Sequence, residues 1–236
     1  MNLIKSYTSK GVRLAISAIC YSRSGALIGG GCIDGSVQVW DNRANGYHRP
    51  SVYIGNAHAV GEVTCVKMFK DEKRIATRGM DDTLKLWDIR NTKHPSQEWK
   101  DLTNLSSKTN ISISPDEKML LTGTSVRKGF AHGLLMGFDV LTGDTLSSLA
   151  ISKDSVVSVC WHPVLNQIII GSADANIRIL YDPDLSQRGI TTSLTKLEKR
   201  RPIDQGLAFS RPILTPCVYE DEREKEMEKD PFNPNN

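Results

Sequence analysis

The side chains most able to do chemistry in this chain are its five histidines and five cysteines. The histidines are His48, His58, His94, His132 and His162. None stands at a spacing typical of metal ligands, and none lies near a serine or cysteine in a nucleophile motif. The cysteines are odd in number and include no Cys-x-x-Cys pair, which disfavours a zinc site and a disulfide framework. We therefore expect no metal, no cofactor, no small-molecule substrate and no enzymatic activity.

One set of polar residues suits a buried hydrogen-bonded chain better than catalysis. It comprises His58, Thr77, Asp81 and Trp87. A histidine, a hydroxyl, a carboxylate and an indole N–H can bond one to the next, and such a chain stabilises a fold when every member has a partner. We predict that these four residues form a structural network.

The stretch that carries this set is repeated along the chain. The four copies end at Trp40-Asp41, Trp87-Asp88, Phe138-Asp139 and Tyr181-Asp182, at spacings of 47, 51 and 43 residues. These spacings are close to the roughly 40–45 residues of one WD-type propeller blade. The copies are not equal: the first has Gly30 in place of the hydroxyl, and the fourth has Leu180 in the register of the tryptophan.

Each copy is predicted to be built of strands. Residues 16–21, 63–68 and 156–161 alternate between apolar and polar, and each is followed by a polar turn and a short apolar run. β-branched and aromatic residues dominate these runs. We predict three strands per copy and an all-β fold, a WD-repeat β-propeller with about four blades. Cys20, Cys65 and Cys160 lie in these first strands and are expected to be small buried hydrophobic residues.

The predicted blades divide the chain into a propeller and an extension. The blades are expected at about 11–48, 58–98, 101–148 and 153–189, so that 1–189 form the propeller and 190–236 a polar, largely disordered C-terminal extension. Closed propellers have about four to eight blades, and closure leaves only short, protected edges. Four blades from a larger ring would expose two blade faces. We expect these blades to belong to a longer ring of the seven-bladed type.

Four short motifs resemble one WD-repeat family. They are Gly123-Thr-Ser, Trp161-His-Pro-Val-Leu-Asn-Gln-Ile, Tyr181-Asp-Pro-Asp-Leu-Ser-Gln-Arg-Gly and Ile213-Leu-Thr-Pro. Together they are similar to the WD repeat-containing protein 70 family, also called gastrulation-defective homologues, from about residue 11 to residue 230. The resemblance covers the later blades and the C-terminal extension of that family. It implies a nuclear setting linked to chromatin.

The two regular copies share an ending that indicates a docking site. They end Trp40-Asp41-Asn-Arg43 and Trp87-Asp88-Ile-Arg90. The stretches 28–43 and 75–90 are similar to the "DWD box" of WD proteins that dock the damaged-DNA-binding adaptor of cullin-RING ubiquitin ligases. An arginine after the third strand can lie at one rim and bind a partner carboxylate or carbonyl. The alternative is that each arginine pairs with a neighbouring blade.

Two further segments are candidates for binding. The third copy has an insertion with Arg127, Lys128 and Phe130 in a glycine-flanked loop, and such loops often carry binding sites. A tolerated surface insertion is the alternative. In the extension, a basic cluster is a candidate for nuclear import and comprises Lys196, Lys199, Arg200 and Arg201.

Composition narrows the function further. The net charge is +3, too small to indicate nucleic-acid binding except through partners. No apolar run approaches the roughly 20 residues of a membrane span, and no signal segment is recognised at the start. We expect a non-catalytic nuclear scaffold, with the cytoplasm as a second location. The leading hypothesis is a ubiquitin-ligase substrate receptor in the chromatin or DNA-damage response; the alternative is a structural component of a spliceosome-like ribonucleoprotein.

Overall fold

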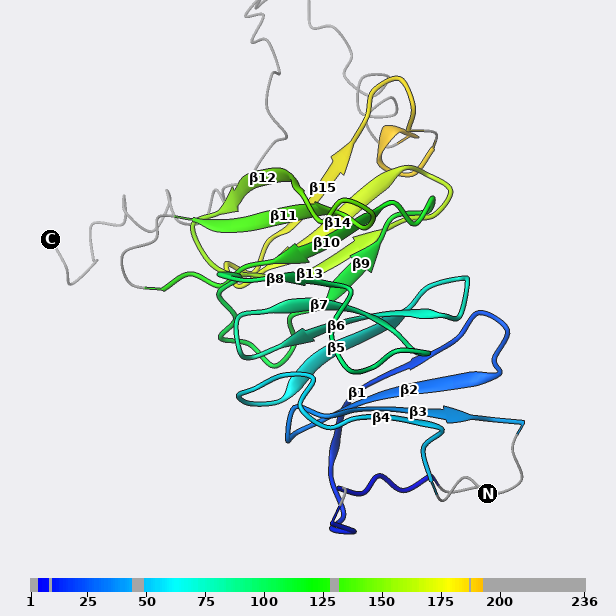
Figure 1. Cartoon of the computed structure of the whole chain (residues 1–236). Coiled ribbons are helices and arrows are strands. Elements are labelled where there is room, and N and C mark those ends of the chain that lie inside the picture. Colours follow the sequence, from blue (N-terminus) through cyan, green and yellow to red (C-terminus); the bar gives the residue numbers. More distant parts are fainter. Residues whose placement is uncertain (1–3, 9, 44–48, 128–131, 187, 193–236) are drawn as a thin grey trace, which may run out of the picture. The chain divides into compact units, whose positions relative to one another are not determined.

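The computed structural model describes residues 4–8, 10–43, 49–127, 132–186 and 188–192. The chain divides into two compact units, Met1–Leu194 and Thr195–Asn236. The second unit lies outside the described ranges. In the first unit, the described residues form four antiparallel sheets that follow one another in chain order (Figure 1).

Each sheet contains the three strands predicted for one copy, so the all-β repeat fold is confirmed, although β4 (Val52–Ile54) and the end of β12 (Thr145–Ser152) lie outside the predicted blade bounds of 11–48 and 101–148. Blade 1 comprises β1 (Ile16–Tyr21), β2 (Leu27–Cys32), β3 (Val37–Asp41) and β4 (Val52–Ile54). Blade 2 comprises β5 (Val63–Met68), β6 (Arg74–Gly79), β7 (Leu84–Asp88) and β8 (Gln97–Trp99). Blade 3 comprises β9 (Ile111–Ile113), β10 (Met119–Gly123), β11 (Gly133–Asp139) and β12 (Thr145–Ser152). Blade 4 comprises, in the described ranges, β13 (Val156–Trp161), β14 (Gln167–Ser172) and β15 (Ile177–Tyr181).

The prediction of three strands per blade was wrong for blades 1 to 3, which have an outer fourth strand. The strands β4 and β8 have three residues each, too few for an alternating pattern to be recognised in the sequence. The strand β12 has eight residues, but most of them are exposed and they do not alternate cleanly. Outer strands pack on one side only, so their sequences carry a weak signal.

Consecutive blades pack through apolar side chains. Between blades 1 and 2, Val37 and Val39 of β3 share one buried cluster with Val63 and Val66 of β5. Similar clusters join blade 2 to blade 3 and blade 3 to blade 4. Burying each such side chain contributes about 1.5–3 kcal/mol, so the contacts between blades are a main source of stability.

At two of these contacts between consecutive blades, a glycine lets the strands approach closely. A Cβ atom on Gly31 of β2 would lie 2.6 Å from Cβ of Val63, and one on Gly123 of β10 would lie 2.6 Å from Cγ1 of Val156. Contacts this short do not occur between real carbon atoms, so only glycine fits at these positions. The first strand of blade 2 is thereby brought against β2, and the first strand of blade 4 against β10.

The turns between the first two strands also connect neighbouring blades. Glu72 and Glu117 have positive φ angles of 55° and 61° in these turns. The Ser24 amide donates to Glu72 Oε1 over 2.9 Å, and the Lys70 amide donates to Glu117 Oε1 over 2.7 Å. Each glutamate therefore binds the turn backbone of the preceding blade. These turns define one end of the blades, called here the β1–β2 rim.

Candidate functional site

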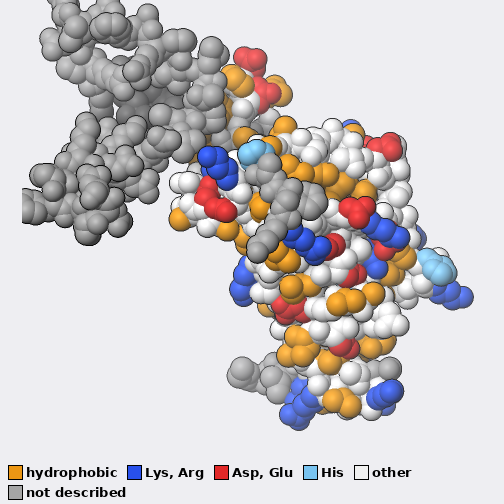
Figure 2. All heavy atoms as spheres, turned by 90° about the vertical axis from the view of Figure 1, so that its left-hand side faces the viewer, with side chains coloured by type: hydrophobic (Ala, Val, Ile, Leu, Met, Phe, Trp, Pro, Cys, Tyr) orange, Lys and Arg blue, Asp and Glu red, His pale blue; other side chains and the backbone are white. Residues whose placement is uncertain are grey.

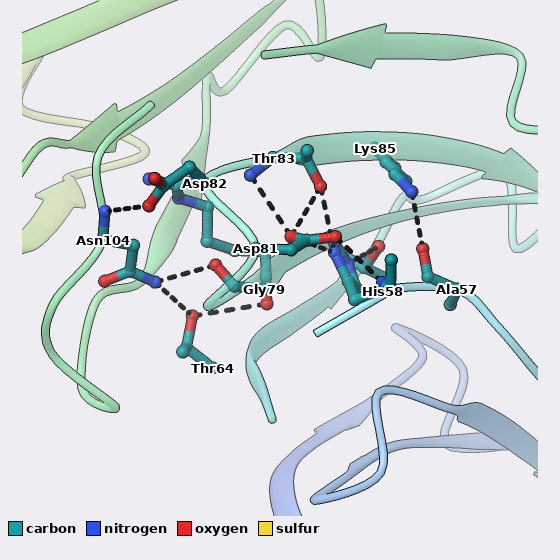
Figure 3. A network of polar contacts seen from close by, with 12 residues as sticks. Ala57, His58, Thr64, Gly79, Asp81, Asp82, Thr83, Lys85 and Asn104 are labelled. Carbon is teal, nitrogen blue, oxygen red and sulfur yellow. Dashed lines mark hydrogen bonds and ion pairs between the residues drawn. The ribbon is translucent and has the colours of Figure 1, made fainter. Parts of the chain in front are cut away.

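The four residues of the predicted structural network lie in contact in blade 2, and Figure 3 shows part of this network. The indole Nε1–H of Trp87 donates to Thr77 Oγ1 over 3.0 Å. Thr77 Oγ1 lies 2.9 Å from His58 Nε2, and His58 Nδ1 lies 2.9 Å from Asp81 Oδ1. His58 comes from the loop before β5, Thr77 from β6, Asp81 from the β6–β7 turn and Trp87 from β7. The network thus ties together three parts of one blade.

The partners fix the direction of each hydrogen bond in this chain. Since Thr77 accepts from Trp87, its own hydroxyl donates to His58 Nε2, and the His58 Nδ1–H donates to Asp81. Burial lowers the pKa of His58 even though the bond to Asp81 raises it, so the imidazole is neutral near pH 7. Burial of Asp81 opposes ionisation, but hydrogen bonds from His58 and Thr83 hold its pKa well below the ordinary value.

The network continues from blade 2 into blade 3. Asp82, which follows Asp81, has a φ angle of 61° and accepts from the Asn104 amide over 2.7 Å. Its other oxygen accepts from Arg127 Nη2 over 2.7 Å. The Asn104 side chain donates to the Gly79 carbonyl over 2.9 Å. Arg127, which was predicted to lie in a candidate partner-binding loop, forms an ion pair between blades, and its side chain is 49% exposed, so its role in partner binding stays a prediction. Lys128 and Phe130 lie outside the described residues.

Asp82 and Asn104 were not predicted from the sequence, although one signal was present. The turn of blade 2 has two consecutive aspartates, whereas the equivalent turn of blade 1 is Asp34-Gly35. Gly35 has a φ angle of 81° in its turn, and Asp82 adopts the same left-handed conformation at the equivalent position although it carries a side chain. In this conformation the carboxylate of Asp82 accepts two hydrogen bonds from blade 3, which offset the strain of the left-handed backbone.

Blade 1 lacks the hydroxyl of the network. Gly30 pairs with Gln38 as Thr77 pairs with Lys85, so Gly30 is the equivalent of Thr77. Trp40 Nε1 is buried with no hydrogen-bond partner among the described residues. A Cβ atom on Gly30 would lie 2.8 Å from Cζ3 of Trp40, so the indole fills the space that the threonine side chain would need.

Blades 3 and 4 depart from the pattern as the sequence predicted. Phe138 and Leu180 pair with Leu120 and Ile168 in the register in which Trp87 pairs with Ile75. Neither side chain can donate a hydrogen bond. In blade 4, Asp174 instead accepts from Ser152 over 2.8 Å and from Arg178 over 2.6 Å. Ser152 and Arg178 could not be predicted from the sequence because no spacing rule connects them with Asp174.

The two Trp-Asp-x-Arg endings have the same geometry in blades 1 and 2. Arg43 Nε donates to Asp41 Oδ1 over 3.0 Å and Arg43 Nη2 to Asp41 Oδ2 over 2.9 Å. The corresponding distances from Arg90 to Asp88 are 3.0 and 2.6 Å. The arginine side chains are 73% and 68% exposed. We call these two pairs the Asp–Arg forks.

Both forks lie at the β1–β2 rim. The Asn42 amide donates to the Ala26 carbonyl over 2.7 Å, and the Ile89 amide donates to the Lys73 carbonyl over 2.8 Å, which joins each fork to the first turn of its own blade. The geometry does not favour the alternative, in which each arginine pairs mainly with a neighbouring blade. The closest partner of Arg43 is Asp41, and the charge of Glu72 in blade 2 raises the pKa of Arg43 less than Asp41 does.

The forks present charged groups that are already oriented. Hydrogen bonds from the arginines lower the pKa values of Asp41 and Asp88 to about 2, so both carboxylates are ionised at pH 7. Each fork uses two of the five N–H groups of its guanidinium. The others can bind a carboxylate or carbonyl of a partner, and the aspartate restricts the side chain beforehand.

The other residues considered for chemistry were His162 and the cysteines, together with possible metal ligands. No group of three or more histidine, cysteine, aspartate or glutamate side chains there could hold a metal ion. His162 Nδ1 accepts from the amides of Val164 and Leu165, which is a turn role. Burial raises the pKa of Cys20 to about 11. The prediction that Cys160 is buried was wrong, because it lies on a side of blade 4 that no described blade covers.

Two observations bear on membrane-spanning helices and on the distribution of charge. No helix among the described residues is long and apolar enough to cross a membrane. Figure 2 shows positive and negative side chains interspersed with hydrophobic ones on the face in view. A strong field of one sign, which non-specific nucleic-acid binding requires, is therefore not seen on this face.

Comparisons with known proteins agree with the repeat. The family model "WD domain, G-beta repeat" matches residues 2–41, 50–88 and 143–180. It leaves out most of blade 3, where the turn aspartate is missing and the insertion occurs. The β-propeller domain of Cps50 (Swd1) from Myceliophteria thermophila has a similar fold, with a TM-score of 0.61 and 15% sequence identity over 77% of this chain and 59% of that one.

Full-length relatives match nearly the whole chain. WD repeat-containing protein 70 of Xenopus laevis is 35% identical over 98% of this chain, and that of Homo sapiens is 34% identical over 99%. The gastrulation defective protein 1 homolog of Drosophila melanogaster is 31% identical over 92%. The chain spans 38%, 36% and 33% of these three relatives, so it corresponds to little more than a third of their length.

Proposed function

Because the chain belongs to the WD repeat-containing protein 70 family, we propose that it is a binding scaffold whose two Asp–Arg forks dock an adaptor of cullin-RING ubiquitin ligases. The WD-repeat β-propeller is a protein-interaction fold, and its rims commonly carry the binding residues. In this role the chain acts as a substrate receptor in the chromatin or DNA-damage response. The whole protein is then a non-catalytic component of the ligase.

The observation that carries this proposal is the repetition of the fork. Two blades in succession hold an exposed arginine by the same two hydrogen bonds to an aspartate two residues earlier. A buried tryptophan anchors the strand before each fork. Exposed surface ion pairs contribute little to stability, so the repeated geometry is better explained by recognition than by folding.

The test is recovery of the adaptor with the R43A/R90A double variant. We expect recovery from cells to fall strongly, because both guanidinium groups are removed while Trp40 and Trp87 stay in place. The variant R43K/R90K keeps the charge but loses the planar fork, and we expect it to fail as well. Unchanged recovery with R43A/R90A would overturn the proposal.

Arg127→Ala is the matched control for this experiment. Arg127 is also a partly exposed arginine paired with an aspartate, but it belongs to the opposite end of the strands, beside Asp82. We expect normal recovery of the adaptor with this variant. Equal loss with Arg127→Ala would show that the experiment reports a general effect of arginine removal.

We also propose that the protein acts in the nucleus and that the basic cluster of the extension directs it there. These four residues lie outside the described ranges, so the support comes from the sequence and the family. A fluorescent fusion of the full chain should be nuclear, and replacing Lys196, Lys199, Arg200 and Arg201 by alanine should shift it to the cytoplasm. Retention of the variant in the nucleus would exclude this role for the cluster.

The ribonucleoprotein alternative has less support. Its candidate contacts with RNA are Arg127, Lys128 and the 196–201 cluster; of these only Arg127 lies in the described residues, and no second blade repeats its pair with Asp82 there. Splicing or chromatin proteins remain partners to be tested. Crosslinking that recovers RNA from the R43A/R90A variant as well as from the wild type would favour this alternative over the adaptor.

A further inference from the structure

The corner of the chain that carries each Asp–Arg fork recurs in blade 3 with a different side chain. The third strand of blade 3 ends at Phe138-Asp139, and Leu141 stands where Arg43 and Arg90 stand in blades 1 and 2. In each corner, Oδ1 of the aspartate accepts from the amide two residues later, over 2.9 Å from Arg43, 2.9 Å from Arg90 and 2.7 Å from Leu141. The three side chains therefore leave the backbone from equivalent corners.

A second hydrogen bond places the blade 3 corner at the β1–β2 rim. The Val140 amide donates to the Lys118 carbonyl over 2.9 Å, and the amides of Asn42 and Ile89 make the same contact with the first turns of their own blades. Leu141 thus lies at the same end of the strands as both forks. It is 75% exposed, and the arginine side chains of the forks are exposed to a similar degree.

The exposure of Leu141 is not that of an uncovered blade face. Blades 2 and 4 both pack against blade 3 within the described residues, through buried apolar clusters. Val140, the residue before Leu141, is 3% exposed and belongs to the cluster between blades 2 and 3. One apolar side chain of the corner therefore serves folding, whereas the next one stands on the surface.

The backbone around Leu141 is held by the outer strand of blade 2. The Trp99 Nε1–H donates to the Gly143 carbonyl over 2.7 Å, and Gln97 Nε2 donates to the Leu141 carbonyl over 3.4 Å. Both donors belong to β8. Since the backbone is restrained beforehand, binding through this side chain costs less conformational entropy than binding through a loose loop.

The first turn of the following blade differs between the forks and Leu141. After each fork this turn carries a glutamate, Glu72 in blade 2 and Glu117 in blade 3. The first turn of blade 4, residues 162–166, reads His-Pro-Val-Leu-Asn and has no carboxylate. The carboxylate is thus present after an arginine corner and missing after the leucine corner. The β1–β2 rim changes from paired charges at the forks to an apolar corner at blade 3.

We propose that Leu141 is the apolar anchor of the docking surface that the forks begin, so that three successive blades present arginine, arginine and leucine to one partner. This inference rests on the proposed function of the forks and adds the chemistry of the partner's surface. The adaptor then presents carboxylate or carbonyl oxygens to Arg43 and Arg90 and an apolar pocket to Leu141. An apolar anchor beside oriented polar contacts is the usual composition of a specific interface. Because the order is asymmetric, it also fixes the direction in which the adaptor lies across the blades.

The test is the affinity of the purified full chain for the purified adaptor, measured by titration calorimetry at low and at high salt. Leu141→Ala should weaken binding roughly tenfold at both, because salt does not screen an apolar contact. R43A/R90A should weaken binding and also reduce its dependence on salt. Leu141→Arg allows a third fork with Asp139, yet it should weaken binding at least as much as Leu141→Ala, because it places a charge against an apolar pocket.

Leu105→Ala is the matched control. Leu105 is also an exposed leucine, at 56%, but it lies in the loop before β9, at the opposite end of the strands, where its amide donates to Ser125 Oγ over 3.0 Å. We expect this variant to bind as the wild type does. Leu141 and Leu105 are both exposed, so the thermal midpoints of all three leucine variants should match that of the wild type.

The outcomes separate this inference from the proposed function. If Leu141→Ala or Leu141→Arg binds as tightly as the wild type while R43A/R90A is weakened, the leucine anchor is overturned and docking through the forks stands. Equal loss with Leu105→Ala would also overturn the anchor. If R43A/R90A binds as tightly as the wild type, or the wild type does not bind, the proposed function fails and this inference fails with it.

Discussion

Replacing Thr77 by valine tests the buried network most sharply. The two side chains have nearly the same shape, so the substitution removes only the hydroxyl that stands between Trp87 and His58. The Trp87 Nε1–H and the His58 Nε2 both lose their partner in a place without solvent. An unsatisfied buried polar group costs about 1–3 kcal/mol, so for the two groups we expect a loss of about 2–6 kcal/mol of unfolding free energy.

Two companion variants separate the hydroxyl from packing. Thr77→Ser keeps the hydroxyl and loses one methyl group, which should cost about 1 kcal/mol. Trp87→Phe removes the donor, as Phe138 does naturally in blade 3. The double variant Thr77→Val/Trp87→Phe should therefore cost about 1–2 kcal/mol less than the sum of the single changes. Urea unfolding followed by tryptophan fluorescence measures all four proteins, and a Thr77→Val protein as stable as Thr77→Ser would refute the reasoning.

The remaining predictions concern pH, close packing and the ion pair between blades. The pKa of His58 is lowered in the folded state, so below about pH 6.5 the unfolded state binds more protons than the folded state. The free energy of unfolding should therefore fall as the pH drops from about 7 to about 5. In urea unfolding, His58→Asn should reduce this dependence of stability on pH. Gly31→Ala should cost about 1–3 kcal/mol through overlap with Val63, seen as a lower thermal midpoint, whereas Gly171→Ala should leave the midpoint unchanged. Arg127→Ala should cost less than about 1 kcal/mol in the same assay, because its pair with Asp82 is partly exposed.

The sequence was sufficient for the repeat and for the network of blade 2. The spacing of the Trp-Asp pairs and the alternation of the first strands reflect local rules, and local rules are readable in one sequence. His58, Thr77, Asp81 and Trp87 could be found because their types differ sharply from the apolar positions around them. The register of Leu180 could be counted directly from the Asp174 turn.

What the sequence could not predict depends on contacts between distant residues. The bond from Arg127 to Asp82 joins residues 45 positions apart, and only the packing of blade 3 on blade 2 brings them together. Cys160 was expected to be buried because it has the register of Cys20. A blade covers Cys20, whereas no described blade covers Cys160, and burial depends on that neighbour rather than on the local pattern.

The docking role of the Asp–Arg forks is tested most directly by the affinity of the purified chain for the purified adaptor. If each arginine is a binding hot spot worth about 2 kcal/mol, each single alanine variant should weaken the affinity roughly thirtyfold, and R43A/R90A about a thousandfold. Arg127→Ala should bind as the wild type does. A double variant that binds the adaptor as tightly as the wild type, or a wild-type chain that does not bind it, would contradict the account.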